Sequence, residues 1–220
     1  MHFTALIATS FLGLTTALPT PSACSTSLMR RAIGTSTGFN LRVNVTDPSK
    51  DLVPSVQDFY FSDLRTGAGT AISILTSQAP SPVFYLNGTA GATTVTHDIP
   101  NVYPLSISIA GPDSFDYFYP TEHPIGTAIN GGSLLSLGGQ VPVLLPLAGD
   151  EGGSYAACQR DFVVGGSKTS ILTARYVYGN ETIPADCAPI EFVVECATLE
   201  NLPAGSSWNH DSALDVACVA

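Results

Sequence analysis

The apolar and polar positions of this chain alternate with a period of two over many short stretches. The clearest is residues 39–45, FNLRVNV, where every second residue is apolar. Such alternation puts successive side chains on opposite faces and predicts a half-buried β-strand. Similar short runs follow at regular intervals, each bounded by Pro, Gly or Asn-Gly: residues 56–62, 70–76, 83–86, 93–97, 105–110, 115–119 and 141–147.

The stretch from Gly152 to Cys196 carries the strongest pairing signal. Residues 155–164 and 170–178 flank the turn sequence GGSK and predict an antiparallel hairpin. Residues 190–196 place an apolar set on one face and Glu191 and Glu195 on the other, which predicts a strand with a solvated, acidic outer face.

The fold class follows from the number and spacing of these strands. No window contains a convincing 3.6-residue apolar stripe, and only residues 212–218 show a weak one. We expect a single all-β domain, either an antiparallel β-sandwich or a closed barrel, of about ten short strands stapled by disulfides.

The first 31 residues have the pattern of targeting and processing segments. Residues 1–17 hold an apolar run followed by small residues, as in a secretory signal peptide, and the run is too short to span a bilayer. Residues 18–31 end in Arg30-Arg31, a dibasic pair like a fungal kexin-type processing site. A buried N-terminal helix and a chance basic pair are the alternatives. We expect a signal peptide at 1–17, a pro-segment at 18–31 and a secreted, extracellular β-rich domain at 32–220.

Charge narrows the possible partners. The chain has 8 Lys and Arg against 18 Asp and Glu, a formal net charge of −10. Removal of Arg30 and Arg31 leaves 8 − 2 = 6 against 18, or −12. Such an acidic chain repels phosphate backbones and anionic membrane surfaces, so we expect neither nucleic acid nor a membrane as partner after signal removal. We expect a monomer.

Cysteine count supports the processing hypothesis. Cleavage after Arg31 removes Cys24 and leaves four cysteines, which allow three disulfide connectivities. Cys187 and Cys196 are separated by an extended strand of up to about 30 Å, so they cannot bond to each other. Local geometry favours Cys158–Cys187 with Cys196–Cys218. The alternative pairs Cys158 with Cys196 and Cys187 with Cys218.

Three Asn-x-Thr sequons fit a secreted surface. Asn44 lies on the polar face of its predicted strand, and Asn87 and Asn180 lie at predicted turns. We expect all three to carry N-linked glycans.

The sequence contains no convincing catalytic motif. Ser36 lies in GTSTG, which matches the nucleophile-elbow pattern, but no strand precedes it, and we place it in a flexible N-terminal arm. Glu191 and Glu195 lie about 13 Å apart along one strand, too far for a glycosidase pair on their own. The alternative is a catalytic pair in which the fold brings in the second carboxylate from a strand distant in sequence. We therefore assign no catalytic residue.

Histidine and cysteine spacing indicates no metal site. His97, His123 and His210 do not stand at the spacing of a local metal site, and we expect them to be surface or capping residues. The sequence has no phosphate-binding Gly loop and no Rossmann fingerprint, so we expect no cofactor.

Aromatic residues are the remaining candidates for ligand contact. Tyr117 and Tyr119 lie in an aromatic run, and Trp208 lies in a polar C-terminal segment. If these rings are exposed, they can stack on sugars. The alternative is that they pack in the interior of the domain.

Short strings along the chain resemble a family. They are FNLRVNV at 39–45, DFYFSDLRTGAG at 58–69, FYLNGT at 84–89, GGSYAACQ at 152–159 and IPADCAPIEFV at 183–193. In this order they resemble an uncharacterised group of small secreted ascomycete proteins that form a domain of unknown function. Ser154-Tyr155 stands where an aromatic residue, often Trp, follows Gly-Gly in that group, and Cys196 and Cys218 look like additions. The resemblance implies secretion and a β-rich fold, and it brings no activity.

Two function classes remain. The first is a non-catalytic extracellular or cell-surface module that binds carbohydrate or another extracellular protein, and the second is an extracellular hydrolase. An exposed aromatic surface without convergent carboxylates favours the first, whereas two carboxylates facing each other across a cleft favour the second.

Overall fold

The computed structural model describes residues 32–67, 69–78, 82–99, 102–113, 122–129, 132–164 and 167–220. All of them belong to one compact unit, Arg31–Ala220. The expected signal peptide at 1–17, the expected pro-segment at 18–31, and Tyr117 and Tyr119 with their predicted strand lie outside the described residues. In the described ranges, no helix has the length and apolar character needed to cross a membrane.

The described chain is all-β, as expected, and its strands join into one 15-stranded sheet. A short 3-10 helix, η1 (Pro48–Lys50), follows the second strand. The strands are β1 (Ile33–Ser36), β2 (Gly38–Val45), β3 (Tyr60–Gly67), β4 (Thr70–Thr76), β5 (Phe84–Thr89), β6 (Ala92–Ile99), β7 (Tyr103–Ile109), β8 (His123–Ala128), β9 (Leu137–Gly138), β10 (Val143–Leu144), β11 (Ser154–Val164), β12 (Ser167–Val177), β13 (Cys187–Ala197), β14 (Ala213–Leu214) and β15 (Val216–Val219).

The sheet is branched, so the expected ten-stranded sandwich or closed barrel was wrong in its detail. Strand β2 pairs with β13 along its whole length, and on its other edge it pairs first with β5 and then with β3. Strand β8 likewise pairs with β7, β4 and β12. Among the described ladders only β13–β15 is parallel. Side-chain alternation reveals a strand but not its number of partners, which is why the branching was not predicted.

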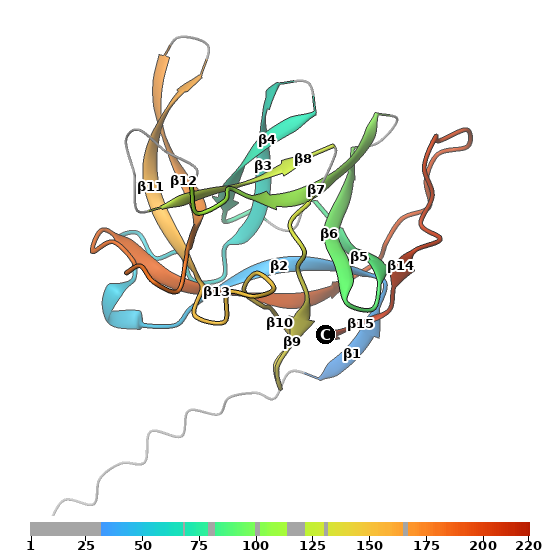
Figure 1. Ribbon diagram of the computed structural model, residues 1–220, viewed down its shortest axis with the longest axis horizontal. Helices are drawn as coiled ribbons and strands as arrows, with labels where there is room; N and C mark the ends of the chain where they lie inside the picture. The colour runs from blue at the N-terminus through green and yellow to red at the C-terminus, as the bar shows by residue number, and fades with distance from the viewer. Residues whose placement is uncertain are drawn as a thin grey trace, which may run out of the picture. The chain divides into compact units, whose positions relative to one another are not determined.

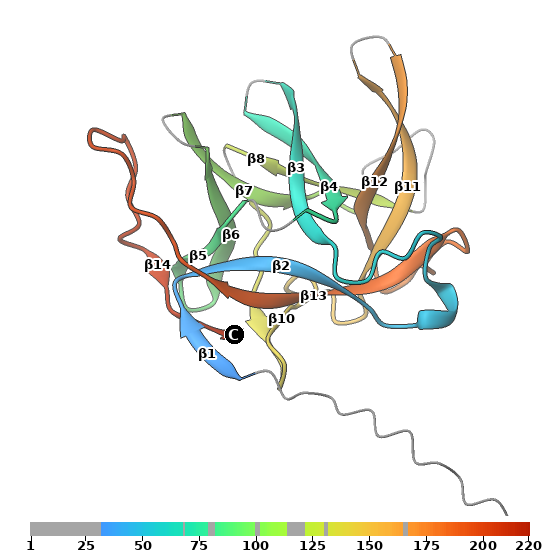
Figure 2. The same cartoon turned by 180° about the vertical axis from the view of Figure 1, so that it is seen from behind.

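The pair β2–β13 connects the hairpins. In Figures 1 and 2 the two strands lie side by side, and hairpins β3–β4, β5–β6 and β11–β12 extend from the same side of them. The β11–β12 hairpin is in register from Ser154↔Val177 to Val164↔Ser167, which confirms the predicted hairpin. Strand β13 begins at Cys187, three residues before the predicted start at Ile190.

The predicted alternation of β2 is reproduced in the core. Phe39, Leu41 and Val43 are fully buried, and Arg42 and Asn44 point to the other face. A continuous series of edge-to-face ring contacts runs through the interior, with neighbouring ring centroids 4.7–5.6 Å apart. Such contacts stabilise the fold beyond the burial of apolar area alone. Their order is His123, Tyr178, Tyr176, Tyr155, Phe192, Phe61, Phe84 and His97.

Two disulfides cross-link strands of the sheet, and their connectivity is the one that the sequence analysis favoured. Cys158–Cys187 joins β11 to the start of β13, where these two residues are directly opposite in the ladder. Cys196–Cys218 joins the end of β13 to β15. Both ends of β13 are therefore covalently fixed.

The N-terminal segment of the domain is a strand, which corrects the expectation of a flexible arm at Ser36. Strand β1 pairs with β15 from Ile33↔Val219 to Ser36↔Val216. The Ser36 hydroxyl donates a hydrogen bond to the carbonyl of Ala197 at 2.7 Å. The partner of β1 is far away in sequence, and a four-residue run without strong alternation gave no signal for it.

Candidate ligand-binding site

A polar and aromatic cluster covers the outer face of hairpin β5–β6. Tyr85 comes from β5 and Asp98 from β6, on the face opposite the core residues Phe84 and His97. Trp208 and His210 come from the segment between β13 and β14. We call these four residues, Tyr85, Asp98, Trp208 and His210, the Asp98 cluster.

Strand β14 brings the two parts of the cluster together. It pairs with β5 through Ala213↔Asn87 and Leu214↔Leu86. The backbone N–H of Gly88 also donates to the carbonyl of Ser212 at 3.1 Å. The chain that precedes β14 is thereby held against the hairpin, and Trp208 and His210 reach Asp98.

All three neighbours converge on the Asp98 carboxylate. The indole N–H of Trp208 donates to Oδ1 at 2.9 Å, and the Tyr85 hydroxyl donates to the same oxygen at 3.3 Å. Nε2 of His210 lies 2.8 Å from Oδ2. The rings of Tyr85 and His210 contact each other with centroids 4.8 Å apart.

Exposure differs sharply within the cluster. Tyr85 is 1% exposed, whereas the side chains of Asp98 and His210 are 15% and 19% exposed, and Trp208 is partly exposed. Burial, followed by the charge of Asp98 and the hydrogen bond to it, raises the pKa of Tyr85. The phenol therefore stays protonated and acts as a fixed donor, while Asp98, His210 and Trp208 meet the solvent.

The cluster has the chemistry of a small polar ligand site. An ionised carboxylate offers about four lone-pair positions, and three of those on Asp98 are engaged. One acceptor position and the partly exposed indole remain for a ligand. Of the predicted stacking residues, Trp208 lies in this cluster, whereas Tyr117 and Tyr119 lie outside the described residues.

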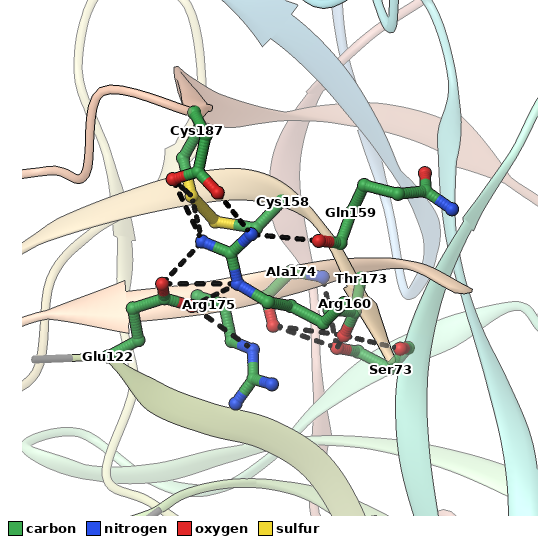
Figure 3. Close-up of polar contacts among 10 residues, drawn as sticks. Ser73, Glu122, Cys158, Gln159, Arg160, Thr173, Ala174, Arg175 and Cys187 are labelled. Carbon is green, nitrogen blue, oxygen red and sulfur yellow. Dashed lines mark hydrogen bonds and ion pairs between the residues drawn. A yellow bond between two sulfur atoms is a disulfide. The ribbon is translucent and has the colours of Figure 1, made fainter. Parts of the chain in front are cut away.

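A second polar group, the Arg160 network, lies inside the fold and is structural. Figure 3 shows Glu122, Arg160 and the Cys158–Cys187 disulfide, and the largely exposed Asp186 joins this group through Arg160. Nε of Arg160 donates to Oε2 of Glu122 at 2.8 Å, Nη1 donates to Oδ2 of Asp186 at 2.9 Å, and Nη2 lies 2.8 Å from Sγ of Cys187. Arg160 and Glu122 are 2% and 3% exposed, so this pair is buried.

Hydrogen bonds and charge settle the ionisation of the Arg160 network. Burial alone would lower the pKa of Arg160, but the hydrogen bonds that Arg160 donates to Glu122 and Asp186, with their negative charges, outweigh it and raise that pKa. The hydrogen bond from Arg160 also holds the pKa of Asp186 below its usual value. Nε of the buried Arg175 lies 3.6 Å from Oε2 of Glu122, on the other side of this carboxylate (Figure 3). Glu122 is thus held between two guanidinium groups.

Glu122, Cys158 and Cys187 bring possible metal-ligating atoms within 4.8 Å of one another. The chemistry of this set does not fit a metal ion, because both sulfurs are bonded in the disulfide and cannot act as thiolates. The guanidinium of Arg160 also occupies the space beside Glu122.

Two of the histidines expected at the surface are buried, and that expectation was wrong for them. His97 is 2% exposed, with Nε2 3.6 Å from Oδ2 of Asp63. His123 is 1% exposed, with Nε2 3.2 Å from Oε2 of Glu181. Each follows the inward face of its strand, which the alternation of β6 and β8 could have indicated. Only His210 belongs to the Asp98 cluster.

The fold does bring distant carboxylates together, but around an arginine. Nη1 of Arg42 pairs with Asp58, and its Nε lies 3.5 Å from Oε1 of Glu195. The Tyr60 hydroxyl donates to Oε2 of Glu195 at 2.9 Å. Glu191 accepts a hydrogen bond from the Asn44 side chain at 2.7 Å. Each of these carboxylates is engaged by a neighbouring donor, and a guanidinium group lies between Asp58 and Glu195.

A cavity of about 280 Å³ lies beside β13. Most of its lining is apolar, including Val143, Leu145, Ile183 and Pro189. Its one carboxylate, Glu191, is the acceptor of the Asn44 hydrogen bond. The mostly apolar lining of this cavity contrasts with the polar side chains that meet at the Asp98 cluster.

The three sequon asparagines occupy different settings. Asn180 is exposed at a turn, as expected. Asn44 is partly buried on the outer face of β2, and Asn87 lies within β5 beside Ala213 rather than at a turn. The Asn-Gly pair at 87–88 suggested a turn, but the actual turn follows at residues 90–91.

The fold and site define an all-β, disulfide-stapled domain with a polar aromatic cluster on one hairpin. The chain belongs to a family described as a domain of unknown function, DUF7907, whose model matches residues 36–196. The matched region includes Tyr85 and Asp98 and ends before Trp208 and His210.

A relative comes from a fungus. The chain is 29% identical over 201 residues to antigenic protein SchS34 of Stachybotrys chartarum, covering 85% of this chain and 87% of that protein. No solved structure matches the chain.

Proposed function

We propose that this protein is a secreted, non-catalytic carbohydrate-binding module and that the Asp98 cluster is its binding site. The observation that carries the proposal is the hydrogen bond between Trp208 and Asp98 in a partly exposed position. Protein sites for sugars combine an aromatic face, against which the apolar side of a pyranose packs, with polar groups that accept or donate hydrogen bonds to its hydroxyls. Trp208 supplies the first, and Asp98 and His210 supply the second.

The hydrolase alternative has weaker support. A glycosidase needs two carboxyls at a defined separation with one able to donate a proton. Asp58 and Glu195 approach each other only through Arg42, and Glu122 is buried between Arg160 and Arg175. In both places a guanidinium group, rather than a second carboxyl, faces the carboxylate.

The proposed secretion of the protein fits an extracellular ligand. Two disulfides persist most readily in an oxidising compartment, and the fungal relative is described as antigenic. We infer that residues 1–17 and 18–31 are removed, leaving Ala32 as the first residue, and that Asn44, Asn87 and Asn180 carry glycans. Intact-mass analysis of the secreted protein, before and after endoglycosidase treatment, tests both inferences.

Trp208 makes a direct test possible, because it is the only tryptophan in the chain. A sugar that stacks on it should change its fluorescence with a saturable dose dependence, whereas sugars bound elsewhere should not. A glycan array with the mature protein selects the ligand, and fluorescence titration then measures its affinity. Trp208→Ala should abolish retention on the array. If the Trp208→Ala variant is still retained on the array, the Asp98 cluster is not the carbohydrate-binding site.

A further inference from the structure

The charge of the Asp98 cluster restricts the type of sugar that it can take. Asp98 is contacted by an indole, a phenol and an imidazole, and none of these three contacts is a lysine or arginine. Two of the donors, those of Trp208 and Tyr85, are neutral and cannot offset the carboxylate charge. The third contact, the imidazole of His210, offsets the carboxylate charge only if it is protonated, so with a neutral imidazole Asp98 keeps a negative field at the partly exposed side of the cluster.

The rest of the protein strengthens this field. The chain carries a formal net charge of −10, and summed charges of one sign attract counter-ions and repel like ions over distances beyond direct contact. An anionic sugar would meet repulsion both from the surface and from Asp98. A cationic sugar would gain from both.

We propose that the ligand of the Asp98 cluster is an amino sugar with a free ammonium group, in an oligomer of hexosamine units. This inference rests on the proposed function, because it assumes that the cluster binds a carbohydrate. The ammonium takes the remaining acceptor position of Asp98 and lies close to the indole of Trp208, whose ring face attracts cations. The pyranose ring packs against the exposed part of the same indole.

The N-acetylated form of the same oligomer is the matched ligand control. It has the same ring and linkage but carries a neutral amide in place of the ammonium. A charge-assisted hydrogen bond is about twice as strong as a neutral one, so the free-amine oligomer should bind at least about tenfold more tightly. Trp208 fluorescence is titrated with both oligomers near neutral pH, where a share of the sugar amines is protonated, because protonation of His210 in acid would offset the Asp98 charge. The preference should weaken at high salt because salt screens exposed charges.

Two matched variants test which carboxylate determines the preference for the free-amine oligomer. Asp98→Asn keeps the shape and an acceptor oxygen but removes the charge, and it should reduce the preference for the free amine to near unity. Asp211→Asn removes one charge from an exposed residue of the same segment, whose contact is a hydrogen bond within the local turn, and it should keep the preference. Circular dichroism checks that each variant is folded.

The outcomes separate the inference from the proposed function. Equal affinity for the two oligomers, with Trp208 responding to both, would overturn the ammonium inference and leave carbohydrate binding intact. Absence of any Trp208 response to cationic, neutral or anionic oligosaccharides would overturn both. If Asp98→Asn is unstable, the comparison of the two oligomers on the unmodified protein still decides the matter.

Discussion

Trp208 donates its indole N–H to Oδ1 of Asp98 at 2.9 Å across 110 residues of sequence. This contact fastens the segment between β13 and β14 to hairpin β5–β6, and it orients the indole. Local stability, and under the proposed function ligand binding as well, therefore depends on this hydrogen bond.

Asp98→Ala should loosen the segment that carries Trp208. The change leaves the indole N–H and the Tyr85 hydroxyl without their acceptor, which costs about 1–3 kcal/mol in the free energy of unfolding. Trp208 fluorescence should shift to longer wavelength as the ring becomes more solvated, and limited proteolysis should cut the segment faster. Asp211→Ala, in the same segment, should change neither measurement.

Arg160→Met should be among the most destabilising single substitutions. It leaves the buried carboxylate of Glu122 without its bidentate partner, and breaking a buried ion pair in this way costs about 3–5 kcal/mol. Urea unfolding measures the loss. The double variant Arg160→Met with Glu122→Leu should recover only part of it, because it removes the unpaired Glu122 charge but also takes the carboxylate neighbour from buried Arg175. Lys168→Met removes an exposed pair with Asp161 and should have little effect. Equal effects of Arg160→Met and Lys168→Met would contradict the structural role of the Arg160 network.

His97 should make stability depend on pH. Burial lowers the pKa of His97 below its ordinary value of about 6.5, and this outweighs the opposing charges of Asp63 and Asp98. The unfolded chain then takes up a proton at a higher pH than the folded chain, so the stability present above about pH 6.5 is lost as the pH falls below it. In His97→Gln, the fall of the unfolding free energy between neutral and mildly acidic pH should be shallower. An unchanged pH dependence of the unfolding free energy in that variant would show that His97 does not contribute to it.

Each disulfide should stabilise the protein by roughly 3–4 kcal/mol on the chain-entropy model, since the bonded residues are 29 and 22 positions apart. Paired Cys→Ser replacements of Cys158 with Cys187, and of Cys196 with Cys218, measure the two contributions by urea unfolding. Non-reducing peptide mapping should recover these same pairs. A linked Cys158–Cys196 peptide would show the alternative connectivity instead.

Local pattern was enough to predict much of the fold. Strand β2 was predicted from alternation and the β11–β12 hairpin from alternation and its turn residues. A half-buried strand has apolar residues on one face and polar residues on the other, so the two types alternate along the sequence. The extended length of β13 excluded one of the three disulfide connectivities, and the proximity of the chain segments favoured the observed one over the alternative. The shortest strands, β9, β10 and β14, have two residues each and cannot show a period.

The candidate site could be predicted only in part. Trp208 was identified by its residue type and polar surroundings, but its partners Asp98 and Tyr85 lie on a hairpin more than 100 residues earlier. Their meeting depends on the pairing of β14 with β5, and a two-residue strand leaves no trace in the pattern. The Arg160 network was missed for the same reason, since Glu122 and Asp186 reach Arg160 from separate elements.

The position of β13 has a consequence for how the chain is made. Strand β2 ends at Val45, but the partner that covers its whole length, residues 187–197, leaves the ribosome only after a further 141 residues (46–186) have been made. Until then one edge of β2 is an open template for pairing with other chains. Sequence-distant pairings also slow folding. The nascent chain therefore has a long interval in which chaperones must protect it from aggregation, and a product truncated before residue 187 would remain in that vulnerable state.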